Sequence, residues 1–441
     1  MNDLLAARSQ MAMSLAFHIL FAVAGIAMPL LMVIAEGRWL RTRDPVDLDL
    51  TQRWARGTAV LFAVGGVSGT VLSFELGLLW PRFMAHAGPI IGMPFSLEGF
   101  AFFLEAIALG IYLYGWHRVP PGAHWLAGLV IALSGVVSGI FVVTANAWMN
   151  TPAGFRLAGG DPVDIDPVAA MFNPAAFSET LHMTLAAYLS VGFAVAAIHA
   201  FMLLREPTNR FHRRAFAIAF TLAAVAAVLQ PLSGDHSAKL VARTQPVKLA
   251  ALEGQFQTMR GAPLRLGGMP DERAGVTRWA IEIPRGLSFL AYSDMDAPVM
   301  GLESVPRADW PPVRITHLAF QVMVACGLLL LAVSAMGDIL AWRARRLPDA
   351  RWFLRLVVAC GPLGFVALEA GWVVTEVGRQ PWIIQGVMRT RDAVTPMPYL
   401  IVPFTAFTLL YLVLGLVVAA VLARQVFASP RTPEAPDRAR G

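Results

Sequence analysis

Charged residues are scarce in this chain. Only 15% of its 441 residues are Asp, Glu, Lys or Arg, whereas 57% are hydrophobic. Soluble domains carry nearer a quarter charged residues. The shortage excludes an ordinary soluble protein, and the apolar runs that recur along the sequence predict a polytopic membrane protein instead. Each run must then be helical, because a backbone polar group that faces lipid cannot go unpaired.

Cysteine is also rare, and several familiar site motifs are missing. Cys326 and Cys360 both lie inside apolar runs, so we expect them to be packing residues rather than a disulfide. The sequence has no CxxCH motif for covalent haem attachment and no phosphate-binding loop. The net charge of +6 does not indicate nucleic acid, because the arginines cluster in short loops between the apolar runs.

Nine segments are long and apolar enough to cross a bilayer core of about 30 Å. The first is too long for the apolar part of a signal peptide and is expected to be a retained span. Arginine-rich loops follow the first, fifth and seventh segments, so the positive-inside rule predicts an outer N-terminus and an inner C-terminus. The predicted spans are 13–36, 54–79, 95–116, 124–148, 180–204, 214–233, 315–341, 352–377 and 399–423.

The spans divide the chain into four regions. Residues 1–233 hold six spans, and residues 315–426 hold the other three. Residues 234–314 are mixed and polar, begin with a predicted amphipathic helix, and are long enough to indicate a functional segment on the outer face. Residues 427–441 have the composition of a disordered cytoplasmic tail.

Two histidines and a methionine lie inside apolar spans. His18 and His182 are each within about two turns of the outer end of their span, and Met323 lies at nearly the same level as His182. A single membrane histidine often only bonds a neighbouring helix. Two at one depth favour a bound haem, and a His/Met pair is a known axial set for a low-spin haem. We expect the other histidines to be solvated, loop-packed or interfacial; they are His86, His117, His124, His199, His212, His236 and His317.

Glutamates recur in two of the spans. Glu98 and Glu105 are seven residues apart, which places both on one helix face, and Glu369 and Glu376 repeat that spacing. A carboxylate at the centre of a membrane helix costs about 2.5–3.5 kcal/mol on insertion scales. Two carboxylates in a column on one helix face are typical of a proton path. The structural alternative is that they pair with groups on neighbouring helices. Too few histidines lie in the spans to supply a haem–copper centre.

The segments LEGFAFFLEA, FQVMVACG and LEAGWVVTEVGRQPW together resemble subunit I of the cytochrome bd-type quinol oxidases, over nearly the whole chain. This resemblance implies an all-α enzyme of the bacterial inner membrane. Such an enzyme oxidises ubiquinol or menaquinol at the outer face and reduces dioxygen to water at a high-spin haem pair, without copper and without proton pumping. It implies three haems: a low-spin haem b, a high-spin haem b, and either haem d or a further haem b. It also implies a heterodimer with subunit II, with a small single-span subunit as a further partner.

The resemblance assigns a role to each candidate residue. His182 and Met323 match the low-spin haem ligands, and His18 and Glu369 match the ligands of the two high-spin haems. The remaining matches are Glu98 and Glu105 in the proton path, Lys248 and Glu253 in quinol oxidation, and Arg379, Gln380 and Trp382 bracing the haem site.

The chain departs from many family members at two positions. Gln321 stands where they have arginine, and Phe365 stands where they have tryptophan. The outer segment 234–314 is also short for a quinol-binding loop of this family. Together these departures resemble the cyanide-insensitive branch, and they leave open whether the oxygen-binding haem is d or b. Two alternatives from other classes remain: a haem-free secondary transporter that uses the buried glutamates, and a haem-b membrane anchor of a dehydrogenase.

Overall fold

The computed structural model describes residues 2–345 and 348–428, and within these residues nine helical segments could cross a membrane. The prediction of nine spans and a helical fold is therefore confirmed. The first four are α1 (Asp3–Thr42), α2 (Pro45–Leu79), α3 (Pro81–Tyr114) and α4 (Pro121–Asn150). The other five are α6 (Ala176–Arg205), α7 (Arg210–Thr244), α10 (Val313–Ala344), the pair α11 (Arg351–Cys360) and α12 (Leu363–Val377), and α14 (Ile401–Phe427).

The helices begin where the sequence supplies capping groups. The Asn2, Asp44 and Asn209 side chains accept backbone N–H bonds at the starts of α1, α2 and α7. Proline at the first position starts α2, α3 and α4, where its missing N–H costs nothing. Most helices run several residues beyond the predicted apolar spans, because the polar ends continue the same helix outside the apolar window.

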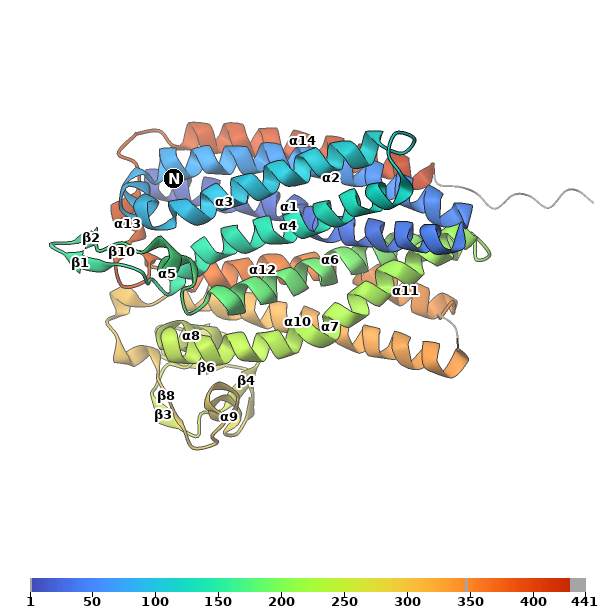
Figure 1. The fold of residues 1–441 in the computed structure, drawn as a ribbon. Helices are drawn as coiled ribbons and strands as arrows, with labels where there is room; N and C mark the ends of the chain where they lie inside the picture. The colour runs from blue at the N-terminus through green and yellow to red at the C-terminus, as the bar shows by residue number, and fades with distance from the viewer. Residues whose placement is uncertain (1, 346–347, 429–441) are drawn as a thin grey trace, which may run out of the picture.

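Consecutive helices pack as antiparallel neighbours. The pairs α1–α2, α3–α4 and α6–α7 lie side by side, and α12 packs against both α6 and α10 (Figure 1). Glycine permits the closest approaches. A Cβ on Gly192 of α6 would lie 2.9 Å from Ala223 Cβ of α7, and a Cβ on Gly364 of α12 would lie 2.5 Å from Ser190 Cα of α6. Small residues at such crossings are typical of membrane helix bundles.

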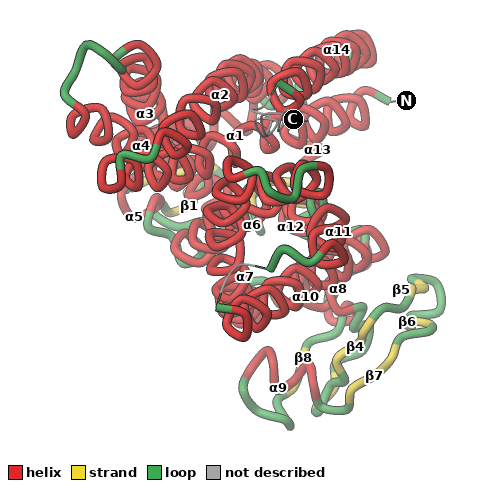
Figure 2. The backbone as a smooth tube through the Cα atoms, turned by 90° about the vertical axis from the view of Figure 1, so that its right-hand side faces the viewer, coloured by secondary structure: helices red, strands yellow, loops and turns green. Residues whose placement is uncertain are grey.

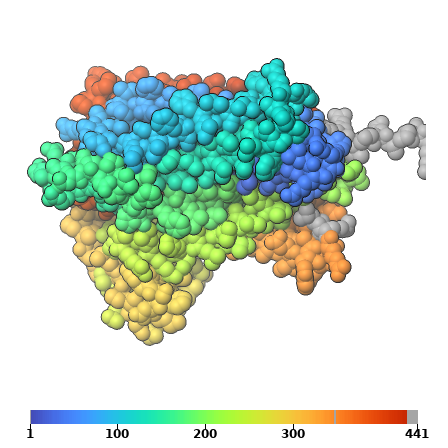
Figure 3. All heavy atoms as spheres, in the orientation of Figure 1, coloured from blue at the N-terminus to red at the C-terminus, as the bar shows by residue number. Residues whose placement is uncertain are grey.

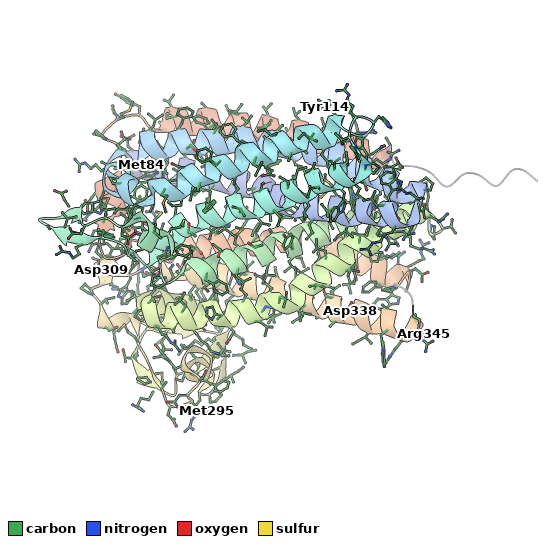
Figure 4. The ribbon with its side chains drawn as sticks, in the orientation of Figure 1. Met84, Tyr114, Met295, Asp309, Asp338 and Arg345 are labelled. Carbon is green, nitrogen blue, oxygen red and sulfur yellow. The ribbon has the colours of Figure 1, made fainter. Side chains whose placement is uncertain are left out.

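The N-terminus and the end of α14 lie at opposite ends of the bundle (Figure 1). We call the end that carries the N-terminus the loop end. Met84 and Asp309 lie at the loop end, whereas Tyr114, Asp338 and Arg345 lie at the opposite end (Figure 4). A chain that crosses the membrane an odd number of times must begin and end on opposite sides, as α1 and α14 do.

Residues 245–312 form a compact lobe that projects sideways at the loop end (Figures 2 and 3). It begins with α8 (Pro246–Glu253), and its strands pair antiparallel as β3 (Met259–Arg260) with β8 (Pro298–Val299), β4 (Leu264–Leu266) with β7 (Ile281–Ile283), and β5 (Met269–Asp271) with β6 (Val276–Arg278). Helix α9 (Gly286–Tyr292) and two 3₁₀ turns, η1 (Leu302–Ser304) and η2 (Arg307–Asp309), complete the lobe.

Two predicted helices differ from the structure. The amphipathic helix expected over residues 239–257 is divided between two helices, because α7 continues to Thr244 and Pro246 starts α8 afresh. The eighth span is broken at Gly361 and Pro362, since proline cannot donate the backbone bond that a continuous helix needs.

Shorter elements close the loop end. They are β1 (Arg156–Ala158), β2 (Asp161–Val163), α5 (Pro167–Met171), β9 (Trp382–Ile384), β10 (Met388–Arg389) and α13 (Thr390–Ala393). The tail predicted to be disordered lies, from residue 429 on, outside the described residues.

Candidate functional site

His182 and Met323 lie on two helices that flank α12. His182, on α6, has its Nδ1 3.2 Å from Ser233 Oγ of α7. The Gln230 amide nitrogen lies 3.1 Å from His182 Nε2 and 3.3 Å from its Nδ1. Met323 projects from α10 toward Gly371 of α12, where a Cβ would lie only 3.2 Å from its sulfur. Helix α12 thus leaves space for the thioether, as a sulfur ligand requires.

His18, on α1, is held in one tautomer. The Ser68 hydroxyl of α2 donates to the Val64 carbonyl oxygen at 2.8 Å, so it must accept from His18 Nδ1, 3.0 Å away. Nε2 then keeps its lone pair, as metal ligation requires. Gly69 makes room for the ring, because a Cβ there would lie 3.0 Å from its Cε1.

Glu369, on α12, is partly buried, and its Oε1 is fully enclosed without a hydrogen-bond partner among the described residues. Buried polar atoms are nearly always satisfied, so an orphaned carboxylate oxygen indicates a group that the protein alone does not supply. A haem iron is such a group.

Glu98 and Glu105 both face α4, which confirms that they share one helix face. Glu105 is 5% exposed and lies beside Gly135 of α4, where a Cβ would be 3.3 Å from its Oε1. Ser138, one turn further along α4, donates to Glu98 Oε1 at 3.4 Å. The two acids therefore line one seam between α3 and α4.

A buried polar network at the loop end surrounds Lys248. Its Nζ donates to Asn150 Oδ1 of α4 at 2.8 Å, and Asn150 Nδ2 donates to Glu179 Oε1 of α6 at 3.2 Å. Burial lowers the pKa of Lys248, and the Glu179 carboxylate opposes that shift. Asn150 and Glu179 were not among the site residues predicted from the sequence. The signal for the first was the pair of asparagines one turn apart in NAWMN, just where the fourth span ends.

Arg379 is the second cation at this end, and only 2% of it is exposed. Its Nη2 donates to Glu376 Oε2 at 2.5 Å, and Asn146 of α4 donates to the other oxygen of Glu376. Its Nε and Nη1 are buried without a partner among the described residues. A guanidinium with two free donors fits an anionic group such as a haem propionate.

A cavity of about 170 Å³ opens beside this network. Its lining includes Lys248 of α8 and the turn residues Arg379, Gln380 and Trp382. Arg389 stacks over the Trp382 ring at 4.8 Å and pairs with Asp309, which also lines the cavity. A cavity of about 150 Å³ holds one benzene ring, so this one has room for a single aromatic ring.

Glu253, at the end of α8, points elsewhere. No ion pair joins it to Lys248 within the described residues, and the Arg265 guanidinium of the lobe partly opposes the rise in its pKa. Its Oε2 is buried without a described partner, and burial raises its pKa to about 7. A buried carboxyl that titrates near neutral pH and has a free oxygen can accept a proton from a bound donor.

The remaining histidines were expected to be solvated, loop-packed or interfacial, and several of them are buried rather than solvated. His124 is 2% exposed because Glu36 Oε1 lies 2.7 Å from its Nδ1. His199 and His212 are buried together, with their Nδ1 atoms 3.0 Å apart. His317 of α10 is fully buried between the carbonyl oxygens of Leu252 and Gly267, which ties α10 to the lobe.

Fold and site together define a class of protein: a polytopic helical membrane protein whose buried His, Met and Glu side chains suit haem ligation. The chain matches the family model for cytochrome bd terminal oxidase subunit I over residues 6–430, and it belongs to that family. The nine spans among the described residues agree with this membership.

Curated relatives and a solved structure support the same assignment. The chain is 38% identical over 428 residues to a Bacillus subtilis (strain 168) protein named as a cytochrome bd menaquinol oxidase subunit I, with 96% of each chain covered. It is 30% identical over 441 residues to the cytochrome bd ubiquinol oxidase subunit 1 of the same organism, covering 97% of this chain and 94% of the relative. The structure of bd oxidase from Geobacillus thermodenitrificans matches with a TM-score of 0.92 and 40% identity, covering 97% of this chain and 99% of that chain.

The family assignment confirms the resemblance seen in the sequence. The chain is a subunit of a terminal respiratory oxidase and a multi-pass protein of the bacterial inner membrane, and its family carries haem. The transporter and the dehydrogenase anchor are therefore both excluded.

Proposed function

We propose that the chain holds three haems and oxidises a quinol at the loop end to reduce dioxygen to water. His182 and Met323 would ligate a low-spin haem b. His18 and Glu369 would ligate two high-spin haems, one of b type and the other d or b. The observation that carries this proposal is the enclosed, unpartnered Oε1 of Glu369, supported by the two free donors of Arg379. When bound, haem supplies one-electron transfer and, where an axial position is open, a site for dioxygen.

The quinol ring fits the cavity that Lys248, Arg379 and Trp382 line. The Lys248 ammonium can bond a quinol oxygen there, because its flexible stem lets it keep Asn150 as a second partner. Glu253 lies outside the lining of this cavity, so as the proposed proton acceptor it would receive the quinol proton through a bridging water, next to the lobe through which the proton can leave.

Glu105 and Glu98 would deliver protons for water formation from the opposite end of the bundle. Both lie on the α3–α4 seam, and Glu98 is the nearer of the two to the loop end, where α3 begins. Proton uptake at the inner face and release at the outer face would separate charge without a pump, since the loop end is the proposed outer face.

The protein would work as a heterodimer with subunit II, and a small single-span subunit is a further proposed partner. Helices α10 and α14 expose many large apolar side chains along their length, among them Ile315, Leu328, Leu412 and Leu416. Lipid or partner subunits can cover such surfaces.

The deciding experiment is a reduced-minus-oxidised absorption spectrum of the purified protein, with the extracted haems identified as pyridine haemochromes. A low-spin b signal with a far-red chlorin band would establish haem d. Haem b alone, near three per molecule, would retain the oxidase and place the chain in the branch without haem d. A well-folded preparation that contains no haem would refute the ligand assignment.

A further inference from the structure

A second buried polar cluster lies away from the quinol cavity, where α1, α2 and α14 meet. Its members are Gln10 and Ser14 of α1, Glu75 of α2 and Tyr411 of α14. Each is at most 4% exposed, and Ser14 is fully buried. The Gln10 amide donates to Glu75 Oε1 at 2.9 Å, and the Tyr411 ring stacks on Phe17 of α1 with 4.5 Å between ring centroids. The side chains are thus fixed in place.

This cluster leaves four enclosed oxygens unsatisfied. Gln10 Oε1, Glu75 Oε2, the Ser14 hydroxyl and the Tyr411 hydroxyl have no hydrogen-bond partner among the described residues. The Ser14 hydroxyl is a hydrogen-bond neighbour of both the Glu75 carboxyl and the Tyr411 hydroxyl, but neither contact has the geometry of a formed hydrogen bond. A buried oxygen without a hydrogen-bond partner destabilises the folded protein, so four in one place indicate a bound group.

The chemistry of the four oxygens matches water. Gln10 Oε1 and Glu75 Oε2 can accept hydrogen bonds, and the two hydroxyls of Ser14 and Tyr411 can donate them. A water molecule donates two bonds and accepts two, and buried waters make about two to four. A hard cation such as Ca²⁺ takes about six to eight oxygen ligands, mostly carboxylates, which is more than this cluster offers.

The cluster also lies in line with His18. Ser14 is one turn from His18 on the same face of α1, and Glu75 is two turns from Ser68, the partner of His18, on the same face of α2. Polar side chains therefore line the α1–α2 seam from the loop end to the His18 imidazole. The adjoining positions at this seam are otherwise apolar, such as Met11 and Leu76, which pack in a common core cluster.

We infer that Gln10, Ser14, Glu75 and Tyr411 bind an internal water molecule, which forms the outer step of a polar column that ends at His18 and Ser68. The water satisfies the four oxygens and keeps the Glu75 side chain oriented toward α1. The water site does not depend on the proposed function, but the role of the column does. If His18 ligates a high-spin haem as proposed, the column joins that haem site to the outer face and gives product water a way out.

The direct test is a cryo-EM map of the intact oxidase complex at a resolution that shows ordered water. We expect a peak about 2.7–3.0 Å from Glu75 Oε2 and the Tyr411 hydroxyl. Direct bonds among Glu75, Ser14 and Tyr411 with no peak between them would overturn the inference. A peak with five or more oxygens at about 2.3–2.6 Å that changes between sodium and potassium buffers would replace the water with a cation.

Infrared spectroscopy of variants provides a second test. Wild-type protein should show a buried-water O–H stretching band that shifts in H₂¹⁸O. In Tyr411→Phe this band should shift or disappear, since the water loses a donor. Thr408→Val is the matched control on α14, because the Thr408 hydroxyl bonds only the carbonyl of Phe404 in its own helix. An unchanged band in Tyr411→Phe would contradict the inference. Both readouts are independent of haem content and turnover, so they can fail without the oxidase assignment failing.

Discussion

At the scale of single residues, the informative side chains are polar atoms that the helices bury and do not satisfy. Glu369 Oε1 and Glu253 Oε2 are orphaned in this way, as are Nε and Nη1 of Arg379. In contrast, Glu36 and His124 are buried and fully bonded to each other and to Tyr112. The contrast separates the groups that await a cofactor or substrate from those that only hold helices together.

Replacing Glu369 tests the cofactor assignment. We expect Glu369→Ala to lose one high-spin haem of the proposed three while the low-spin haem remains, because His182 and Met323 are on other helices. Oxygen consumption should fall by about 100-fold or more, since even the loss of a partner behind a metal ligand costs about 10–100-fold. Haem content per protein and the reduced spectrum measure both effects.

The exposed Asp338, on α10 at the opposite end, supplies the control. Asp338→Asn removes a carboxylate without touching the site and should keep all haems. Full haem content in Glu369→Ala would contradict the ligand role.

Quinol oxidation should depend on pH through Glu253. Burial raises the pKa of this acid to about 7, so it is protonated at lower pH and cannot accept the quinol proton. The rate should therefore rise as pH increases through about 7. In Glu253→Gln we expect a loss of about 10²–10⁴-fold, the usual contribution of a general base, and no step near pH 7. Steady-state rates between pH 5.5 and 8 measure this.

Glu272→Gln, in the β5–β6 turn of the same lobe, is the control and should keep the wild-type profile. A pH step near 7 that survives in Glu253→Gln would assign the titration to another group.

At the scale of elements, the site depends on how closely α12 packs against α6. Gly364 permits the contact, because any Cβ there would lie 2.5 Å from Ser190 Cα, a backbone atom that cannot turn away. Helix α12 carries both Glu369 and Gly371, so its position sets the carboxylate and the space for the Met323 sulfur. Moving this one short helix would disturb two of the proposed haem sites together.

Gly364→Ala should separate α12 from α6. We expect a loss of about 1–3 kcal/mol in stability from overpacking, together with a shifted low-spin haem spectrum. Gly327→Ala on α10 is the matched control, because nothing lies within 4 Å of its added Cβ although it is one turn from Met323. Thermal unfolding and absorption spectra compare the two variants. Equal behaviour of both would show that the α6–α12 contact tolerates a methyl group.

At the scale of the whole molecule, the proposed redox groups and the quinol cavity gather toward one end of the bundle. Lys248, Arg379 and Glu253 belong to the loop end, and only the α3–α4 acids extend toward the opposite end. If the protons for water come from the opposite end, as proposed, they must cross much of the membrane to reach the oxygen site, while electrons travel only a short way. The proposed enzyme would therefore charge the membrane by where it takes up and releases protons.

Reconstituted in liposomes, the oxidase complex should acidify only the side that holds the loop end, at no more than one proton per electron. A pH indicator inside the vesicles and one outside measure this during quinol oxidation, with an uncoupler as the control. A ratio above one would establish pumping and refute the mechanism. Acidification of the other side would reverse the predicted orientation.

The sequence by itself determined the nine helices, because each needs only a long apolar run and its capping residues, and these are local properties. It also supplied His18, His182, Met323 and Glu369, since a polar residue inside such a run stands out. Family resemblance, rather than spacing, gave these residues their separate roles.

Tertiary structure alone decided which buried polar groups are satisfied. Glu376 and Arg379 pair with each other, and Asn150 joins Lys248 to Glu179 across three helices, whereas Glu369 and Glu75 each keep a free oxygen. Whether a buried polar group is hydrogen-bonded depends on partners that are distant in sequence and meet only when the helices pack. No local pattern can therefore distinguish a glutamate that fastens two helices from one that awaits a ligand.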